Sequence, residues 1–419
     1  MPVVRHKPIS CKFDGYIMIS VQEAEEIILS QVRDYGVEEI PFEAAFGRVL
    51  AQDIRCDRDL PAYNRVTMDG IAVSYASIEQ GVTAFRIRAT QAAGDEPIEI
   101  DELTDCIEIM TGAAQPITAD TVIPYEQITI DNGIATLATS TIKMGQNIHF
   151  KGRDRKQNDI VTPFNSLIDA AVINIAATVG KVTMAVRTRP RILIVSTGDE
   201  LVEVDETPAD YQLRRSNSFS IQAVLQQHAL EADMLHLPDE PFTIENEITE
   251  ALNEYDVLIF SGGVSAGKYD HVPKVLEEVG VHQLFHKIKQ RPGKPFWFGA
   301  HDDGQLVFAF PGNPVSAFMC LHRYFVPWYK RTMGMADDRK IYGVLNDDVT
   351  FTPALQYYMQ VSLDFNEQGQ IVATPLQGNG SGDLANLLES DAFMELPADK
   401  SEFKKGEVYR IWVFKNVLQ

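Results

Sequence analysis

Glycines, hydroxyl groups and a carboxylate stand close together in residues 259–270, which read Ile-Phe-Ser-Gly-Gly-Val-Ser-Ala-Gly-Lys-Tyr-Asp. The apolar run at residues 256–260 predicts a buried strand, and residues 271–279 predict the helix that follows it. Glycines in such a turn let the backbone approach a ligand closely, and the amide groups at the start of a helix attract an anion. Taken alone, the segment indicates either a site for a phosphate-bearing ligand or an ordinary strand-to-helix turn.

Two other predicted strands end in loops of the same kind. Residues 191–196 lead into Thr-Gly-Asp-Glu at 197–200, and residues 305–310 lead into Pro-Gly-Asn-Pro-Val-Ser at 311–316. Loops that leave the carboxyl ends of parallel strands share one edge of an open sheet, and ligands bind there. We therefore expect the three loops to line one crevice. The candidate binding residues in them are Thr197, Gly198, Asp199, Ser261, Gly262, Gly263, Ser265, Asn313 and Ser316.

Carboxylates also occur in these loops, at Asp199, Glu200 and Asp270. They supply hard oxygen ligands or acid groups, but on their own they would repel a bound phosphate. A divalent cation such as Mg²⁺ between carboxylate and ligand oxygen removes this conflict. The loops therefore predict a magnesium-assisted site.

Positive charge is supplied by the segment Gln290-Arg-Pro-Gly-Lys-Pro295, which lies between two short apolar runs. Two prolines around a glycine predict a tight loop, which would hold Arg291 and Lys294 with little freedom to lose on binding. Arginine suits a bidentate contact with an oxyanion, and lysine suits a point contact. The alternative is a solvated basic turn.

Length and charge limit the classes of protein to which the chain can belong. Its 419 residues predict two to four domains, and its formal net charge of −22 argues against a general binder of nucleic acid or membrane surfaces. The four cysteines form no Cys-x-x-Cys pair, so neither a zinc cluster nor a disulfide framework is indicated. We find no apolar stretch long enough to span a bilayer and no signal-peptide core, and we expect a cytoplasmic protein.

The elements that must position these residues fall into four regions. Ser20 and Glu23 form a capping box that opens an amphipathic helix, and a helical period returns at residues 164–177. Between them, short alternating runs separated by glycine and acidic turns predict a β-rich module. Strands and helices alternate from about residue 189 to 335, which predicts a parallel, right-handed, three-layer domain, and the remainder is rich in predicted strands.

Three further segments are ambiguous when each is read alone. Residues 67–70 contain Asp69 beside a glycine, residues 110–113 contain Thr111, and the mixed-charge run at 151–156 contains Asp154. Each is more simply explained as a turn, a strand end or a solvated loop.

Read together and in order, the segments are specific. The set Met68-Asp-Gly, Met110-Thr-Gly-Ala, Gly152-x-Asp154, Ser196-Thr-Gly-Asp-Glu200, Ser261-Gly-Gly-Val-Ser265 with Asp270, Pro292-Gly-Lys-Pro and Pro311-Gly-Asn-Pro-Val-Ser resembles the molybdopterin molybdenumtransferase family. The C-terminal domain of gephyrin belongs to that family. The resemblance runs from about residue 18 to residue 415.

The resemblance implies a multidomain α/β plus β fold. It implies a split helical and extended domain at residues 18–60 and 150–188, and a β-rich domain inserted in it at 61–149. A central three-layer α/β/α domain with a parallel sheet, of the molybdopterin-binding kind, follows at 189–336, and a C-terminal β-barrel at 337–419. It also implies a homodimer in which each active site is shared between the α/β domain of one subunit and the β-rich region of the other.

The family reaction takes adenylylated molybdopterin and molybdate, inserts molybdenum at the dithiolene and releases AMP with the help of Mg²⁺. By resemblance, Glu200 and Asp270 are the carboxylates near the metal, Lys294 stabilises charge as the anhydride breaks, and Arg291 assists in binding molybdate or phosphate. Asp69, Thr111 and Asp154 would come from the partner subunit. Ser261, Ser265 and Asn313 would orient the pterin and its phosphate.

Two positions qualify the resemblance. His149 stands where the family often carries arginine, so the oxyanion contact there would be weaker or dependent on pH. Ser381 lies in a Gly-Ser-Gly segment that resembles a family segment facing the cleft, but a plain glycine-rich turn explains it equally well.

Other functions stay open as alternatives. A scaffold of the same fold would have no need of Asp69, Asp270 and Lys294, which are all present, and a tungsten-inserting relative would share every motif. A separate molybdopterin adenylyltransferase would not need the β-rich module.

Overall fold

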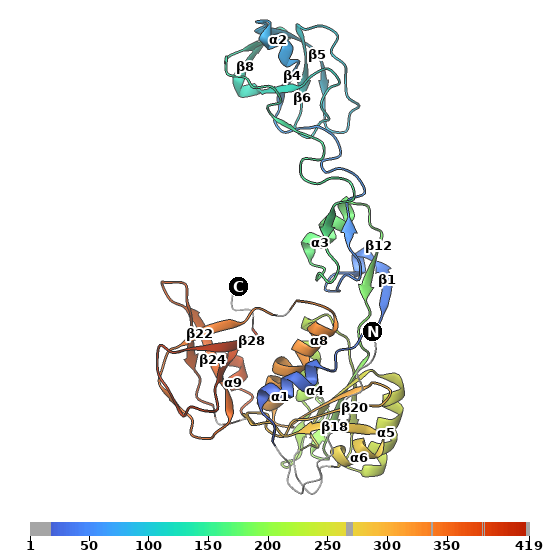
Figure 1. The fold of residues 1–419 in the computed structure, drawn as a ribbon, viewed down its shortest axis with the longest axis vertical. Coiled ribbons are helices and arrows are strands. Elements are labelled where there is room, and N and C mark those ends of the chain that lie inside the picture. Colours follow the sequence, from blue (N-terminus) through green and yellow to red (C-terminus); the bar gives the residue numbers. More distant parts are fainter. Residues whose placement is uncertain (1–17, 265–270, 337, 379, 381, 416–419) are drawn as a thin grey trace. The chain divides into compact units, whose positions relative to one another are not determined.

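The computed structural model describes residues 18–264, 271–336, 338–378, 380 and 382–415. These residues form two compact units (Figure 1). The first unit comprises the described residues within Met1–Glu38, Gly47–Val49 and Arg187–Gln419, and the second comprises Glu39–Phe46 and Leu50–Val186.

A six-stranded sheet forms the centre of the first unit. In spatial order its strands are β16 (Asp233–Leu237), β13 (Ile192–Thr197), β17 (Val257–Ser261), β21 (Leu306–Phe310), β20 (Trp297–His301) and β18 (Val281–His286). The first four strands are parallel, as expected, but β20 and β18 are antiparallel to their neighbours.

The prediction of a parallel sheet is therefore wrong for these last two strands, and the sheet is mixed. Only residues 302–305 connect β20 to β21. A connection of this length makes a hairpin, whereas a parallel crossover needs a dozen residues or more.

Apolar cores lie on both faces of this sheet, and they bury the strands in its centre on both sides. Alternate residues of β13, such as Ile192 and Leu193, enter different cores. One core is covered by α5 (Pro241–Glu254) and α6 (Val272–Glu278). The other is covered by α1 (Val21–Leu29), α4 (Asn217–Gln227), α7 (Pro314–Cys320), the π-helical turn η3 (Leu321–Phe325) and α8 (Val326–Thr332), as Figure 1 shows.

Helix α1 begins where the capping box predicts. The Ser20 hydroxyl accepts a hydrogen bond from the Glu23 amide at 3.1 Å, and a Glu23 carboxylate oxygen accepts one from the Ser20 amide at 2.7 Å. Residues Val21, Ala24 and Ile28 of this helix lie in the same core as Trp328.

The C-terminal part of the first unit is a closed ring of strands. Its members are β22 (Ile341–Leu345), β24 (Gln356–Phe365), β25 (Ile371–Pro375), β26 (Ala392–Leu396) and β28 (Val408–Val413). Each of the five pairs with two others, and the pairing of β24 with β26 closes the ring. Of these, β26 lacks the β-branched residues and the alternation by which strands are predicted. A sixth, two-residue strand, β19 (Gln290–Arg291), adds to β24 from the α/β segment.

The second unit contains a six-stranded sheet. Its order is β7 (Thr121–Pro124), β4 (Gly70–Val73), β6 (Asp105–Ile109), β5 (Ala84–Gln91), β9 (Ile134–Leu137) and β8 (Ile128–Asp131). Apolar clusters pack on its two faces, with Ala72 in one and Ile71 in the other. A separate small core surrounds α3 (Ala170–Thr178), which begins later than the predicted helical period at residue 164.

Short elements complete the two units. In the second unit they are most of the ladder β1 (Val37–Pro41) with β12 (Thr183–Arg187), and the ladders β2 (Ile54–Arg55) with β11 (Ile160–Thr162) and β3 (Arg65–Val66) with β10 (Ile148–His149). The second unit also contains the helix α2 (Tyr75–Glu79) and the 3-10 turns η1 (Phe42–Ala44) and η2 (Tyr125–Gln127). In the first unit they are β14 (Leu201–Val202) with β15 (Leu213–Arg214), β23 (Val349–Thr350) with β27 (Glu402–Phe403), and α9 (Asn386–Glu389).

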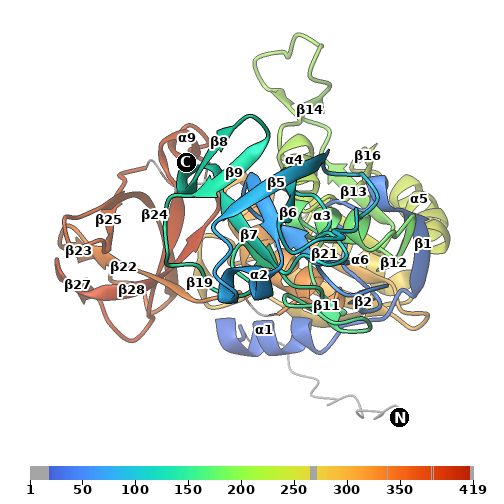
Figure 2. The same cartoon turned by 90° about the horizontal axis from the view of Figure 1, so that it is seen from above.

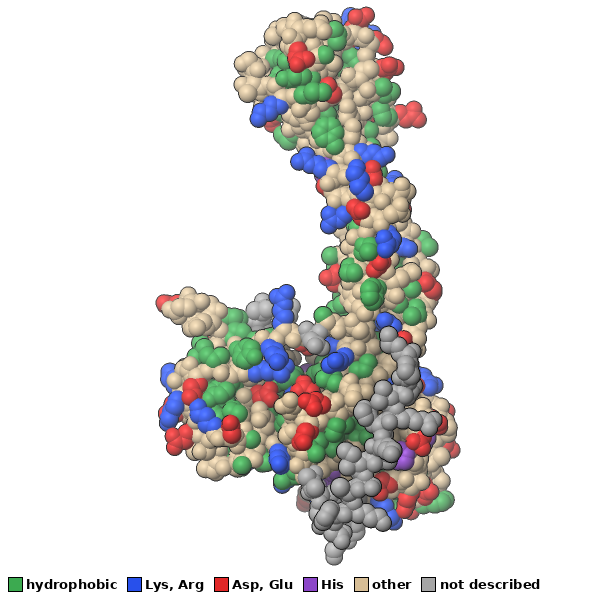
Figure 3. Space-filling view, in the orientation of Figure 1, with side chains coloured by type: hydrophobic (Ala, Val, Ile, Leu, Met, Phe, Trp, Pro, Cys, Tyr) green, Lys and Arg blue, Asp and Glu red, His purple; other side chains and the backbone are tan. Residues whose placement is uncertain are grey.

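Acidic and basic side chains are interspersed over the barrel on the face drawn in Figure 3. Among the described residues, no helix is both long enough and apolar enough to cross a lipid bilayer.

Candidate functional site

The three predicted loops of the first unit line one cavity of about 680 Å³. It lies at the carboxyl ends of β13, β17 and β21, where an open sheet binds ligands. The predicted residues that line it are Thr197, Gly198, Glu200, Ser261, Gly262, Gly263 and Asn313. Ser265 and Asp270 lie outside the described residues, as does Ser381, although its neighbours Gly382 and Leu384 line the cavity.

Two glycines at the cavity occupy conformations that a side chain would disturb. Gly198 has a φ of +138°, and a Cβ there would come within 2.6 Å of Oε2 of Glu200. Gly263 has a φ of +69°, and a Cβ there would lie 2.6 Å from Oγ1 of Thr197. Glycine at 263 thus lets the second loop pack against Thr197 of the first, and the positive φ at 198 favours glycine within the first loop.

Acidic groups gather on one part of the cavity. Glu200 and Asp239 both line it, and an Asp199 carboxylate oxygen accepts a hydrogen bond from the Asp239 amide at 3.0 Å. Burial raises the pKa of Asp239, and the nearby charges of Asp199 and Glu200 raise it further. This crowding of carboxylates is the environment that a divalent cation would relieve.

Asp239 was not singled out from the sequence, although the signal was present. It follows β16 just as Glu200 follows β13, so the rule of polar residues at strand ends applies to it equally.

The start of α4 forms another part of the cavity wall that the sequence analysis missed. Nδ2 of Asn217 donates to the Ser261 hydroxyl at 2.9 Å and to the Gly312 carbonyl at 2.7 Å, so this one side chain connects two loops. Arg214, Arg215 and Ser218 also line the cavity. The available signal was the run of polar residues at 214–218 directly before a predicted helix.

Two hydroxyl groups at this cavity are buried and have no hydrogen-bond partner among the described residues. They are Oγ1 of Thr197 and Oγ of Ser218, whose residues are 3% and 1% exposed. A buried hydroxyl without a partner costs free energy, and unpaired groups of this kind are rare in folded proteins. Ser316, in contrast, is buried within α7 and does not line the cavity.

The Arg291 and Lys294 side chains are exposed and do not line the 680 Å³ cavity. Arg291 instead lines a separate pocket of about 210 Å³, together with Tyr357, Gln360 and Gly380 from the C-terminal segment. Pro295, next to Lys294, lines the larger cavity. The tight loop therefore lies between the two pockets.

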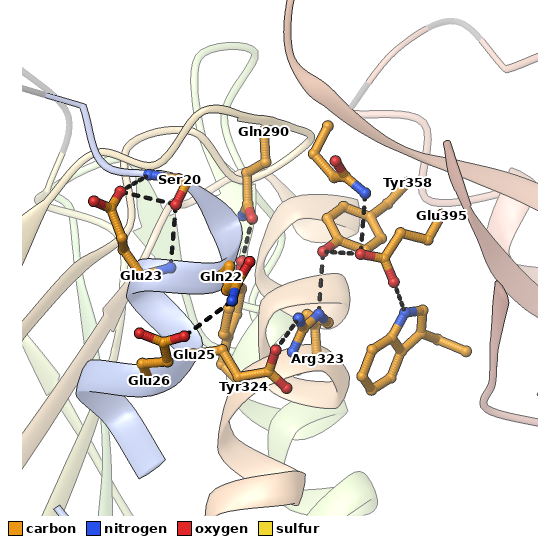
Figure 4. Close-up of polar contacts among 12 residues, drawn as sticks. Ser20, Gln22, Glu23, Glu25, Glu26, Gln290, Arg323, Tyr324, Tyr358 and Glu395 are labelled. Carbon is orange, nitrogen blue, oxygen red and sulfur yellow. Dashed lines mark hydrogen bonds and ion pairs between the residues drawn. The ribbon is translucent and has the colours of Figure 1, made fainter. Parts of the chain in front are cut away.

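A buried network holds this loop, as Figure 4 shows. Gln290 is fully buried, and its Nε2 donates to the Gly293 carbonyl at 3.1 Å. The Tyr324 hydroxyl donates to Oε1 of Gln290. Strand β19 adds backbone pairing between Arg291 and Tyr357. The loop is thus fixed by side-chain and main-chain bonds, which limits the motion of Arg291 and Lys294.

The remaining predicted residues lie in the second unit, in two pairs. The Asp69 carboxylate accepts a hydrogen bond from the Thr111 amide at 2.6 Å, and this bond lowers the pKa of Asp69. Nε2 of His149 lies 2.8 Å from Oδ1 of Asp154. All four residues are at least partly exposed, so each pair is open to a ligand. Within the described part of the chain, no group of three or more His, Cys, Asp or Glu residues is arranged to hold a metal ion.

The sequence matches three family profiles that together span most of the chain. They are described as the MoeA N-terminal region (domain I and II) at residues 19–180, a probable molybdopterin binding domain at 193–331, and the MoeA C-terminal region (domain IV) at 342–414. A molybdopterin molybdenumtransferase of Synechocystis sp. is 38% identical over 400 residues, which cover 95% of this chain and 100% of the relative. The chain belongs to the molybdopterin molybdenumtransferase family.

Other comparisons agree with this membership. A molybdopterin molybdenumtransferase of Haemophilus influenzae is 28% identical and aligns with 94% of this chain and 100% of its own length. The crystal structure of the molybdopterin biosynthesis MoeA protein from Pyrococcus horikoshii matches 96% of this chain and 100% of its own chain, with a TM-score of 0.80 at 25% identity. The predicted multidomain α/β fold is thereby confirmed, and the chain is an enzyme of molybdenum cofactor biosynthesis.

Proposed function

We propose that this member of the molybdopterin molybdenumtransferase family inserts molybdenum from molybdate into adenylylated molybdopterin and releases AMP. The observation that carries the proposal is the 680 Å³ cavity, where three strand-end loops bring together carboxylates, backbone amides and unpartnered hydroxyls. These groups suit a ligand with a phosphoanhydride and hydrogen-bonding rings. The name of the Synechocystis relative supports the same reaction.

Mg²⁺ fits the donors that line this cavity. Glu200 and Asp239 supply hard oxygen ligands, and burial together with the charges of Asp199 and Glu200 raises the pKa of Asp239. We propose that Glu200 and Asp270 hold the ion with Asp239 beside them. The bound ion would neutralise charge on the phosphoanhydride as AMP leaves.

The chain's own groups bind and orient the substrate. We propose that Ser261, Ser265 and Asn313 receive the pterin and its phosphate, with Thr197, Gly198 and Gly262 forming the wall beside them. Asn217 positions Ser261 by donating to its hydroxyl. Asp199, Gly263 and Ser316 act by shaping these loops, and Ser381 is kept as a further candidate binding residue.

The second oxyanion needs a site of its own, and we propose the 210 Å³ pocket for it. Arg291 lines this pocket, and its guanidinium can contact molybdate through two parallel hydrogen bonds. Lys294, three residues further on, would stabilise the charge that develops as the anhydride breaks. Gln290 and Tyr324 hold the loop that carries both cations.

Asp69, Thr111, Asp154 and His149 are proposed to act from a partner subunit in a homodimer. The Asp69 carboxylate is held ionised by the Thr111 amide, which suits contact with a metal or a donor group. His149 lies beside Asp154 and stands where the family often carries arginine. The charge at this position therefore depends on pH, because a histidine can lose its proton. The homodimer rests on the family resemblance.

We propose further that the protein acts in the cytoplasm, and we retain the domain boundaries of the sequence analysis as proposals. A scaffold function is not favoured, because the relatives share an enzyme name. Tungstate remains the alternative oxyanion to be compared with molybdate.

The deciding experiment incubates purified protein with adenylylated molybdopterin, Mg²⁺ and low molybdate. It measures AMP release together with reconstitution of a molybdenum-free apoenzyme. Asp270→Ala should lose turnover while remaining folded. Full turnover by this variant would contradict the metal site, and absence of any AMP release by the unaltered protein would contradict the transferase.

A further inference from the structure

We propose that a second pocket of the first unit binds a tetrahedral oxyanion of the phosphate class, with Arg48 and Arg189 as the receiving side chains. The pocket has a volume of about 650 Å³ and shares no lining residue with the 680 Å³ cavity. The inference is independent of the proposed function, because the proposed reaction gives these two arginines no role.

The pocket lies at the amino ends of the parallel strands, at the opposite edge of the sheet from the three loops. Residues 190–192 lead into β13, residues 231–233 lead into β16, and residues 254–255 precede β17. Strands β13 and β16 lie side by side in Figure 2. These strands have five or six residues each, so roughly 17–20 Å separate the two edges of the sheet. A small ligand in this pocket would therefore not touch one in the larger cavity.

The inner wall of the pocket is apolar. Ile192 and Leu230 line it and are 2% and 1% exposed, and Pro190 beside them is also buried. An apolar wall lowers the local dielectric constant, which strengthens the attraction between a guanidinium group and an anion.

Arg48 brings a buried guanidinium group to this pocket. Only 10% of its side chain is exposed, and its Nη2 donates to Glu38 and to the Arg187 carbonyl, the latter at 2.9 Å. Its Nε is buried and has no hydrogen-bond partner among the described residues. A buried donor without an acceptor costs free energy and is rare in folded proteins, so this nitrogen calls for an acceptor from a ligand.

Arg189 is the second unsatisfied arginine of the pocket. Its Nη2 donates to the Gly47 carbonyl at 3.3 Å, which holds the turn before Arg48 beside it. Its Nε is also buried without a partner, and its side chain forms no ion pair within the described part of the chain. Burial lowers the pKa of Arg189, and the charge of Arg48 lowers it further. The two guanidinium groups repel each other, and a bound anion would remove this repulsion.

The third arginine of the pocket already has its anion. Nε and Nη2 of Arg191 each donate to the Asp256 carboxylate at 3.2 Å, and the Arg191 amide donates to it at 2.8 Å. This bidentate pair satisfies the charge of Arg191. The demand for a further anion therefore comes from Arg48 and Arg189.

Three carboxylates also line the pocket and limit the charge of the ligand. Glu231, Asp233 and Glu254 are exposed, so water and salt screen them. Asp233 also accepts a hydrogen bond from the Tyr255 hydroxyl at 2.8 Å. Contacts between the buried Nε groups and an anion are screened much less. The ligand therefore carries one compact anionic group and little negative charge elsewhere.

A tetrahedral dianion meets these conditions. Its several oxygens can accept hydrogen bonds from two guanidinium groups at once, and such charge-assisted bonds are stronger than neutral ones. Phosphate and molybdate share this shape and charge, so both are sources of the same chemistry. The volume of about 650 Å³ also admits a larger molecule that carries a phosphate group.

The test titrates the full-length protein with inorganic phosphate and with molybdate by calorimetry, in a buffer free of other oxyanions. Arg189→Gln should weaken phosphate binding at this pocket about tenfold or more, the effect of losing a charged donor. The thermal midpoint without ligand should stay the same or rise, because the change removes a partly buried cation beside Arg48. A purely structural role, through the bond to Gly47, predicts a lower midpoint with unchanged phosphate affinity.

A second variant decides the question if Arg189→Gln does not fold. Arg48→Lys keeps the positive charge but removes the Nε donor and the planar fork, so it should also weaken phosphate binding. Arg331→Gln, at an exposed position on α8 outside the pocket lining, is the control for the loss of one positive charge and should leave phosphate affinity as it is. Equal phosphate affinity in Arg189→Gln, Arg48→Lys and the unaltered protein would overturn the proposal.

Oxyanions bound elsewhere are separated by a further variant. Arg291 lines the 210 Å³ pocket, so Arg291→Gln should retain the binding that Arg189→Gln loses. If Arg291→Gln removes all phosphate and molybdate binding, the 650 Å³ pocket is not an oxyanion site. Tighter binding of phosphate than of molybdate to the Arg291→Gln protein assigns the pocket to phosphate, and the reverse order assigns it to molybdate.

Crystals soaked in tungstate locate the ion directly, because tungsten scatters X-rays anomalously. The expected result is an anomalous peak within hydrogen-bond distance of Nε of Arg48 and Nε of Arg189. A peak there without measurable binding in the titration would be an adventitious ion only, and the proposal would fail. A tungstate peak confined to the other two pockets would contradict it as well.

Discussion

Nε of Arg323 donates a hydrogen bond to the Tyr358 hydroxyl at 3.1 Å, and this contact connects the π-helical turn η3 to strand β24 of the barrel. Nη2 of the same guanidinium donates to Glu25 of α1 at 2.8 Å, and the Trp412 ring lies 4.4 Å from it. Only 3% of the Arg323 side chain is exposed. A single buried cation therefore holds together the N-terminal helix, the α/β segment and the barrel (Figure 4).

Arg323→Met should destabilise the first unit by about 2–3 kcal/mol. Loss of the guanidinium leaves Glu25 without its ion-pair partner and removes one bond to the Tyr358 hydroxyl, which still donates to Oε1 of Glu395 at 3.4 Å. The value lies just below the usual range for a broken buried ion pair because Glu25 is partly exposed. Urea unfolding followed by tryptophan fluorescence checks this value. Arg331→Met, at an exposed position on α8, is the matched control and should change stability by less than about 0.5 kcal/mol.

Tyr324→Phe should raise the KM for molybdate several-fold with a smaller change in kcat. The substitution removes the hydroxyl that orients Gln290, which in turn holds the Gly293 carbonyl and so the loop of Arg291 and Lys294. Initial rates at varied molybdate check the effect. Tyr329→Phe removes another buried tyrosine hydroxyl of the same core, away from Gln290, and should leave this KM unchanged. Equal KM changes in both variants would indicate general loosening of the core.

The protein should lose stability in mild acid because of two partly buried histidines, His228 and His322. Burial lowers the pKa of His228 to about 4, and burial with the nearby His228 lowers that of His322 to about 3. Both values lie below the ordinary one, so the unfolded chain binds these protons first and the free energy of unfolding falls as pH drops from about 6.5 towards 4. The stabilisation is fully present above about pH 6.5.

Each histidine can contribute up to about 1.4 kcal/mol per pH unit within that window. His322→Leu keeps an apolar side chain against the Phe318 ring, 4.5 Å away, and should flatten the dependence. Thermal midpoints between about pH 4.5 and 6.5 measure the slope. His282→Leu, an exposed histidine, should leave the slope as it is.

Asp239→Asn should raise the thermal midpoint of the protein in a metal chelator and reduce the additional stabilisation given by Mg²⁺. Burial and the charges of Asp199 and Glu200 raise the pKa of Asp239, so its ionisation costs more in the folded state than in the unfolded chain. This cost is present at neutral pH and disappears as pH falls through the raised pKa. The exposed Asp210 provides the control, and equal responses of Asp210→Asn and Asp239→Asn would contradict the explanation.

Mixing two inactive variants should restore part of the activity if each active site takes residues from both subunits. Asp69→Ala and Lys294→Ala place the defects in different compact units, so a mixed dimer would contain one intact set of residues. AMP release after subunit exchange is the measurement, and light scattering establishes that the proteins are dimers. Exchange without recovery would contradict the shared site.

Short sequence patterns predicted the start of a helix or the end of a strand correctly where interactions between neighbouring residues determine it. The capping box of Ser20 and Glu23 is an example, because both hydrogen bonds form within one helical turn. The apolar runs before Thr197, Gly262 and Pro311 gave three strands and their loops, because residues buried on both faces are continuously apolar.

What sequence patterns did not predict depends on contacts between distant segments. Strand β26 reads Ala-Phe-Met-Glu-Leu, which has no β-branched residue and no regular alternation, and its place in the barrel follows from pairing with β24 and β28. Arg323 gave no signal, since its partners Glu25 and Tyr358 are far away in the sequence. The pairing of Asp69 with Thr111 likewise connects residues 42 positions apart.

Strand β19 contributes only two residues to the barrel, yet it limits how the chain can be truncated or recombined with a relative. Its backbone pairing with β24 fastens the loop of Arg291 and Lys294 to the neighbouring segment. A truncation that removed residues 342–414 would release that loop along with the barrel. A chimaera that exchanged barrels between relatives would have to preserve the backbone pairing of β19 with β24. The gap between the matched regions 193–331 and 342–414 is therefore not a place where the chain can be divided without disturbing the loop of Arg291 and Lys294.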